Sequence, residues 1–250
     1  MERARTAINM GVVSLANHWL ERRWSAVRGT TTELRLPGRS GDCLTQISPE
    51  YHVDYGLKPM AARDLGDVGW SESSSASGAS IVMEQAGAGV YLRLETFLSH
   101  QRPGMVRQME LTNTSRVSVT ITRLAVEILP LKKEELPVLE ACRASVETKE
   151  DSGYGYLYYR ALGGIRDTIL IGSSQPEGFA LYEPHPAFCA PIWTGECQLG
   201  PGKSWAPPIS ALFWIGEGPG EAPVSDLEGL HADWMTHRVP GESNESSRQL

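Results

Sequence analysis

Apolar and polar residues alternate with a period of two along much of the chain, which is the pattern of strands with one buried face. In the stretch VYLRLETFL, residues 90–98, Val90, Leu92 and Leu94 share one face. Arg93 and Glu95 share the other face. Clusters rich in Gly, Pro, Asn and Ser separate the apolar runs and predict turns between strands. Further short strands are expected at 154–160, 168–172, 178–183 and 209–216.

The alternation changes phase within the stretch VSVTITRLAVEIL, residues 117–129. Apolar positions are odd-numbered up to Ile121 and even-numbered from Leu124 onward. A shift of one residue along a strand turns every side chain to the opposite face. We therefore predict a β-bulge near Thr122–Arg123, which would keep both apolar sets on the buried side.

One helix is expected, at SDLEGLHADWM, residues 225–235. Ser225 and Glu228 have the spacing of a capping box, and Leu227, Leu230 and Trp234 share one helical face. Many short strands with one late helix predict an all-β protein, with a single antiparallel domain over residues 1–235. We expect residues 236–250 to form a disordered tail and the serine-rich stretch 71–80 to form a flexible loop.

Composition excludes several classes of function. The chain has 250 residues and a net charge of −7, and its longest basic clusters are ERR at 21–23 and KK at 132–133. A nucleic-acid partner is not expected, because binding to phosphates needs a basic face. No apolar run approaches the roughly 18 residues of a membrane-spanning helix, and the start lacks the apolar core of a secretory leader. The four cysteines show no CxxC spacing, so a soluble, cytoplasmic protein without a metal site is expected.

Known cofactor and nucleophile motifs are missing from the sequence, since it contains no GxxxxGK[ST], HExxH or GxSxG. A lone GAG at 87–89 is too little for a dinucleotide fingerprint. No cofactor is therefore expected. Candidate chemistry is limited to scattered polar and aromatic residues.

His100 follows a predicted strand and precedes the turn QRPG, with Arg102 and Arg107 nearby. A histidine and an arginine at a sheet edge can hold sugar hydroxyls or transfer a proton. A histidine in a surface turn is the plainer interpretation. We retain His100 as a candidate catalytic residue and Arg107 as a candidate ligand-binding residue.

A second candidate is the loop-like stretch YEPHPAFCAPIW, residues 182–193, which its prolines would hold rigid. Aromatic faces beside carboxylates suit stacking on sugars and bonding to their hydroxyls. A packed connection between strands would use the same residues. This stretch adds Glu183 and His185 as candidate catalytic residues, and Tyr182, His185 and Trp193 as candidate ligand-binding residues.

A third candidate is the stretch SPEYHVDYG, residues 48–56, in which Glu50, His52 and Asp54 alternate with apolar or aromatic residues. On a strand these three polar side chains would share one face. Three such side chains can bind a metal, but a solvated strand face is the preferred interpretation. Trp24 and Trp205 flank turns and are further candidates for stacking on a ligand.

The opening stretch, with Leu15, Asn17, Leu20, Arg22 and Trp24, has the pattern L-x-N-x-x-L-x-R-x-[FW]. It resembles the start of the N-terminal β-supersandwich of family 36 glycoside hydrolases, the α-galactosidase type. The segment HQRPGMVRQMELTN resembles that domain's hP-x-hR-x-h-x-hTN strand pair, in which h is apolar. LGPGKSWAPP resembles its L-x-PG-x-x-x-x-P hairpin. The resemblance extends over most of residues 10 to 235 and implies an antiparallel, galactose mutarotase-like β-supersandwich.

In those hydrolases the catalytic aspartates lie on a separate (β/α)8 barrel, so the resemblance carries no K-x-D nucleophile segment over to this chain. The resemblance therefore implies a carbohydrate-recognition or assembly domain without hydrolytic residues. Its partners would be a carbohydrate, a second copy, or a separate catalytic chain.

Two alternatives stay open. The first is a small sugar-active enzyme, a mutarotase-like epimerase or a lyase, that uses a His and a carboxylate on a concave sheet face. It requires a His and a carboxylate within about 6–7 Å, close enough for acid–base work on one sugar ring. The second is a structural module that dimerises through a flat apolar sheet face.

Overall fold

A computed structural model describes residues 3–35, 47–56, 58–128, 138–146, 154–162, 167–173, 179–181, 191–206, 210–217 and 224–238. In these ranges the chain forms three antiparallel sheets and one α-helix, which confirms the all-β prediction. No helix within the described ranges is long and apolar enough to cross a membrane.

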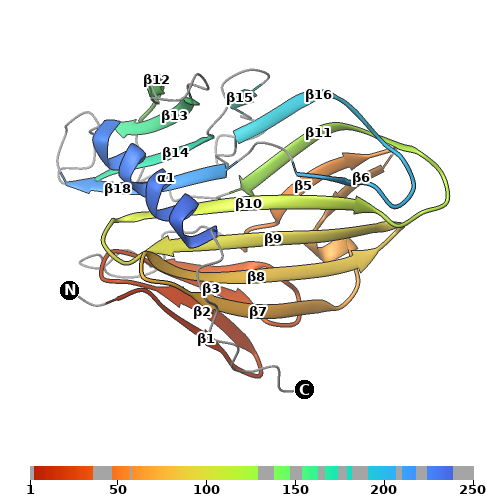
Figure 1. The fold of residues 1–250 in the computed structure, drawn as a ribbon, viewed down its shortest axis with the longest axis horizontal. Helices are drawn as coiled ribbons and strands as arrows, with labels where there is room; N and C mark the ends of the chain where they lie inside the picture. Colours follow the sequence, from red (N-terminus) through yellow and green to blue (C-terminus); the bar gives the residue numbers. More distant parts are fainter. Residues whose placement is uncertain are drawn as a thin grey trace.

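The large sheet holds nine strands, and its order is not that of the sequence. β18, the last strand among the described residues, pairs with β14 on one side and β10 on the other, so it joins the two halves of the sheet (Figure 1). β17 (Ser204–Trp205) pairs with β10 outside the main path. The order is β12 (Val138–Val146), β13 (Tyr154–Leu162), β14 (Asp167–Ser173), β18 (Ser210–Glu217), β10 (Gly104–Asn113), β9 (Val90–Ser99), β8 (Gly78–Gly87) and β7 (Val68–Ser74).

Two smaller sheets complete the fold. The second sheet has five strands, in the order β15 (Phe179–Leu181), β16 (Pro191–Leu199), β11 (Val119–Ile128), β5 (Glu50–Tyr55) and β6 (Lys58–Ala61). A short 3-10 turn, η1 (Ala62–Asp64), follows β6. The N-terminal sheet has four strands in sequence order, β1 (Arg5–Ile8), β2 (Val12–Ala16), β3 (Glu21–Ser25) and β4 (Thr31–Arg35).

The main core lies between the large sheet and the second sheet. Alternate residues of β9 and β10, such as Leu94 and Met109, face Val53 and Ile121 of the second sheet across this core. The pairing register of β11 shifts between Ile121 and Arg123 toward both β5 and β16. Ile121 and Leu124 are both fully buried. The predicted bulge is confirmed, and it returns the even-numbered apolar residues to the core.

The N-terminal sheet is attached through polar and aromatic contacts. The Asn17 side-chain oxygen accepts hydrogen bonds from the backbone N–H groups of Trp19 and Leu20 at 2.9 and 3.0 Å, which closes the β2–β3 turn. Its amide donates to the Ser99 carbonyl at the end of β9, at 2.9 Å. Trp24 packs on Trp70 of β7, with ring centroids 6.1 Å apart. The asparagine of the opening pattern therefore has a structural role.

Helix α1 (Val224–Arg238) lies across β10, β9 and β8 (Figure 1). Leu230 and Trp234 are buried as the pattern predicted, and Trp234 packs on Phe97 with ring centroids 5.5 Å apart. A Cβ on Gly104 would come within 2.4 Å of Leu230, so this glycine allows the close approach. The helix continues to Arg238, so 236–238 are helical and not part of a tail, while 239–250 lie outside the described residues.

The expected flexible loop at 71–80 is instead a β-hairpin, since it holds the end of β7, a turn and the start of β8. Ser75 Oγ accepts hydrogen bonds from the N–H groups of Ser77 and Gly78 in the turn, at 3.2 and 3.4 Å. Ser73 and Ser80 are joined across the strands, Oγ to Oγ, at 2.8 Å. The prediction was wrong because these hydroxyls satisfy the turn and the strand pair, which serine content alone does not indicate.

We expect Leu94→Ala and Ile121→Ala each to lower the free energy of unfolding by about 2–4 kcal/mol, because each leaves a cavity in the core. Denaturant unfolding of both variants would measure the loss. Val117→Ala is the matched control, because Val117 is 66% exposed, and it should change stability by less than about 0.5 kcal/mol. Equal stability of all three variants would contradict this description of the core.

Candidate functional site

Glu50, at the start of β5, does not share a face with His52 and Asp54, which corrects the sequence prediction. Its φ of 67° is left-handed, and this turns its side chain into the interior, where it is fully buried. His52 and Asp54 remain on the outward face, with side chains 40% and 32% exposed, and His52 Nε2 lies 3.0 Å from Asp54 Oδ1. Within the described ranges, no group of three His, Cys, Asp or Glu side chains could hold a metal ion.

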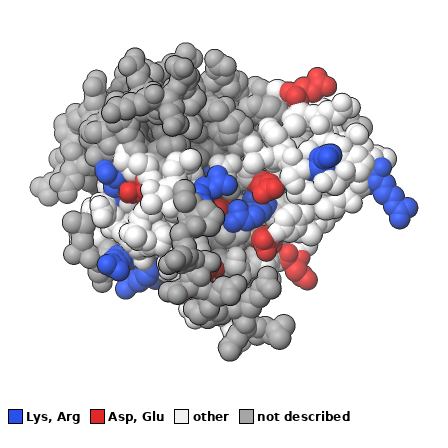
Figure 2. Space-filling model, in the orientation of Figure 1, with Lys and Arg blue, Asp and Glu red and all other residues white. Residues whose placement is uncertain are grey.

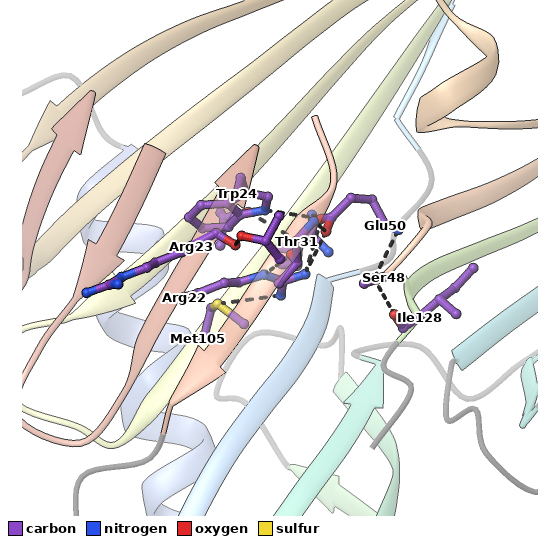
Figure 3. Close-up of polar contacts among 11 residues, drawn as sticks. Arg22, Arg23, Trp24, Thr31, Ser48, Glu50, Met105 and Ile128 are labelled. Atoms are coloured by element: carbon purple, nitrogen blue, oxygen red, sulfur yellow. Dashed lines mark hydrogen bonds and ion pairs between the residues drawn. The ribbon is translucent and has the colours of Figure 1, made fainter. Parts of the chain in front are cut away.

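The Glu50 carboxylate is bound by donors from all sides (Figure 3). Arg22 Nη2 and Arg107 Nη2 lie 3.1 and 2.6 Å from Oε2. The Thr31 backbone N–H donates to Oε1 at 2.6 Å, and Trp24 Nε1–H donates to Oε2 at 3.3 Å. We call these five residues the Glu50 cluster.

Burial alone would raise the pKa of Glu50, but the charges of Arg22 and Arg107 and hydrogen bonding from Thr31 outweigh it and lower the pKa to about 2. The carboxylate is therefore ionised throughout the neutral range. Arg22 and Glu50 are 0% exposed, and Arg107 and Trp24 are 1% exposed. The buried Glu50 carboxylate and its two arginines therefore stabilise the fold. They are inaccessible to a sugar.

Besides Glu50 itself, two sequence candidates belong to the Glu50 cluster. Trp24 is packed in the interior and is not available to stack on a ligand, which corrects that suggestion. Arg107 binds Glu50, and its Nε–H donates to Thr96 Oγ1 at 3.2 Å. A ligand-binding role for Arg107 stays a prediction, but all of these contacts lie inside the protein.

His100 is half-buried just after β9. Its Nδ1 accepts the Ala4 backbone N–H at 2.9 Å, and its Nε2 faces the Ser75 carbonyl oxygen at 3.1 Å. This pattern suits the neutral tautomer with the proton on Nε2, because a carbonyl oxygen can only accept. Both ring nitrogens thus contact the main chain, and the candidate catalytic role of His100 stays a prediction.

The candidates Tyr182, Glu183 and His185 lie outside the described residues. Trp193 is the third residue of β16, where it pairs with Leu124 of β11, so the end of the predicted loop-like stretch is a strand. Pro191 stands at the first position of that strand, where proline is tolerated. The ligand-binding role of Trp193 stays a prediction.

Half-buried charged side chains line the outward side of β8, β9 and β10, the side on which α1 lies. We call Glu84, Tyr91, Arg93, Glu95 and Glu110 the polar face. Arg93 is directly paired with Glu84 on β8 and with Glu110 on β10. Figure 2 shows acidic and basic side chains side by side over these strands.

Hydrogen bonds hold the polar face in place. The Tyr91 hydroxyl donates to Glu84 Oε1 at 2.6 Å, and Arg93 Nη2 lies 3.1 Å from Glu95 Oε2. Burial, and then the hydrogen bond to Glu84, raise the pKa of Tyr91 to about 12. The hydroxyl therefore stays protonated and remains a donor near neutral pH. The Arg93 side chain is 33% exposed and that of Glu95 is 8% exposed.

His237, in the last turn of α1, adjoins the polar face. Its Nε2 lies 3.8 Å from Glu95 Oε1, and its Nδ1 lies 2.8 Å from Ser75 Oγ. The ring packs on Phe97, with centroids 4.8 Å apart. Burial lowers the pKa of His237, although the charge of Glu95 opposes the shift. No sequence motif predicts this His–carboxylate pair, because 142 residues separate its members.

No family model and no curated protein matches this sequence. Solved structures do match. A candidate aldose 1-epimerase from Escherichia coli K12 is 9% identical with a TM-score of 0.51, and the match covers 84% of this chain and 100% of that one. A GH36 α-galactosidase from Geobacillus stearothermophilus is also 9% identical with a TM-score of 0.51, and the match covers 86% of this chain.

This chain spans 41% of the galactosidase, so the likeness concerns one part of that enzyme. At such low identity the likeness establishes the fold and nothing finer. The chain has the galactose mutarotase-like β-sandwich fold, which confirms the fold class that the opening pattern implied.

We expect Glu50→Gln to lower the free energy of unfolding at pH 7 by about 3–5 kcal/mol, because it leaves two buried guanidinium groups poorly compensated. The folded-state pKa of Glu50 lies below its ordinary value of 4.5. Its contribution is therefore present above that value and is lost as the pH falls toward 2.

Denaturant unfolding at several pH values would measure both effects. Wild type should lose more stability than Glu50→Gln between pH 4.5 and 2. Glu33→Gln is the control, since Glu33 forms surface ion pairs with Arg23 and Arg35. It should cost less than about 1 kcal/mol, and an equal cost for the two variants would contradict the role of Glu50.

Proposed function

We propose that the polar face binds a carbohydrate. The observation that carries the proposal is the arrangement of Tyr91, Arg93, Glu84 and Glu110, which presents donors and acceptors on neighbouring strands, while the buried Glu95 holds Arg93 in place. Sugar hydroxyls both donate and accept hydrogen bonds, so they suit a surface that carries both kinds of group. Carboxylates and guanidinium groups form stronger hydrogen bonds than neutral groups do.

The position of Tyr91 and Arg93 on a rigid strand supports the same function. Arg93 and Tyr91 belong to β9, an interior strand of the large sheet, whose other side is buried in the core at Leu92 and Leu94. Sites on strands packed in this way are held more precisely than sites on loops. Little conformational entropy would be lost on binding, because both side chains already have hydrogen-bonded partners.

The structural comparisons add support at the level of the fold. The two matched proteins are named for sugar chemistry, as an aldose 1-epimerase candidate and an α-galactosidase. The fold hosts unrelated functions in general, so the proposal depends on the polar face itself. That face is charged in its described part, which suits a sugar better than the flat apolar surface expected of a dimerisation module.

A second candidate function is proton transfer on a bound sugar, as in a mutarotase-like enzyme. His237 Nε2 and Glu95 Oε1 are 3.8 Å apart, which meets the separation expected of an acid–base pair. Their side chains are only 4% and 8% exposed, and Phe97 covers the histidine ring. This low exposure favours recognition without turnover.

Calorimetric titration with a panel of mono- and oligosaccharides, galactosides included, tests the proposal. We expect binding by wild type and a loss of at least about tenfold in Arg93→Ala, because a charged hydrogen-bond donor is removed. Arg35→Ala is the matched control, because Arg35 is exposed and lies on the N-terminal sheet. No binding across the panel, or equal binding by wild type and Arg93→Ala, would refute a site at the polar face.

An anomer-exchange assay on each bound sugar separates the two candidate functions. Exchange that is lost in His237→Gln would establish the enzymatic alternative. Binding without exchange would leave recognition as the function.

A further inference from the structure

We propose that Glu84 and Glu110 act as specificity-determining residues that admit uncharged saccharides to the polar face and repel uronic acids and sulfated sugars. This inference rests on the proposed carbohydrate binding. It goes further by assigning the class of sugar and the residues that select it.

The charge balance of the polar face is the first step. The five residues hold one guanidinium and three carboxylates, so their formal charge is 1 − 3 = −2. Arg93 stands between Glu84 and Glu110 in the strand register, with one carboxylate on the neighbouring strand at each side. An anionic group that approaches Arg93 must pass close to the carboxylates of both Glu84 and Glu110.

The positive charge of Arg93 is also already paired. Its Nη2 lies 3.1 Å from Glu95 Oε2, and the Glu95 side chain is only 8% exposed, although that of Arg93 is 33% exposed, so water screens this pair in part. A ligand carboxylate or sulfate would have to compete with Glu95 for the guanidinium. A neutral hydroxyl would not, because it can accept from a remaining N–H and donate to a glutamate.

The surroundings of Tyr91 are consistent with this charge balance, since its hydroxyl donates to Glu84 Oε1 at 2.6 Å. After burial, hydrogen bonding to Glu84 and then the charges of Glu84 and Glu110 raise its pKa, and Arg93 offsets only part of this. Both carboxylates therefore act on the same hydroxyl. Like charges placed together at a binding surface suppress the wrong partner, and this is how the two glutamates would discriminate.

The experiment compares oligosaccharides of galactose with oligogalacturonates of the same length, by calorimetry with wild type and two variants. Wild type should bind the uronate at least about tenfold more weakly than the neutral sugar at low salt, and the gap should narrow as salt is added. Glu110→Gln keeps the shape of the side chain and removes one charge. This variant should raise the ratio of uronate affinity to neutral-sugar affinity roughly fivefold.

Glu72→Gln is the matched control. Glu72 is exposed on β7 and pairs with the buried Ile81, so it points to the opposite side of the large sheet from the polar face. This variant should leave the ratio of uronate to neutral-sugar affinity unchanged. A change equal to that of Glu110→Gln would show a general effect of net charge and would overturn the assignment.

The outcomes separate this inference from the proposed function. If wild type binds uronates as tightly as neutral sugars, and Arg93→Ala still binds both more weakly, selection by charge is overturned. The proposed sugar binding would then stand. No binding of either series would refute the proposed function itself. A neutral preference that Glu110→Gln does not reduce would overturn the role of Glu110.

Discussion

The Glu50 carboxylate is bound by side chains from two other sheets. Arg22 comes from β3 of the N-terminal sheet, and Arg107 comes from β10 of the large sheet, while Glu50 itself opens β5 of the second sheet. Buried ions are costly unless each is paired, so the three sheets fit together stably in the arrangement that brings these charges into contact. The orientation of the N-terminal sheet depends on this contact. So does the position of the buried Arg107 side chain on the inner face of β10.

Much of the fold could be predicted from local patterns. Period-two alternation and the turns between apolar runs indicated β9, β11, β13, β14, β15 and β18, because a strand buried on one face needs that pattern whatever its neighbours are. The phase change in β11 indicated the bulge, since Ile121 and Leu124 can both be buried only if a residue is inserted. The hairpin at 71–80 was missed, because the hydrogen bonds of Ser73 and Ser75 depend on partners that composition does not reveal.

The candidate site could not be predicted from the sequence, because its residues become neighbours only through strand pairing and helix packing. Arg93 was assigned only to an outward strand face, because its neighbours Glu84 and Glu110 become adjacent through strand register. His237 meets Glu95 only because α1 returns across the large sheet. Glu50 was placed on the wrong face, because a left-handed φ in a non-glycine residue cannot be inferred from alternation.

The position of β18 has a consequence for synthesis on the ribosome. β7 to β10 and β12 to β14 are all translated before β18, yet β18 is the strand that pairs with both β10 and β14. Until it emerges, each half of the large sheet ends in an open edge, which is a template for unwanted strand pairing. The two halves of the large sheet can therefore be joined only after residues 210–217 have been translated.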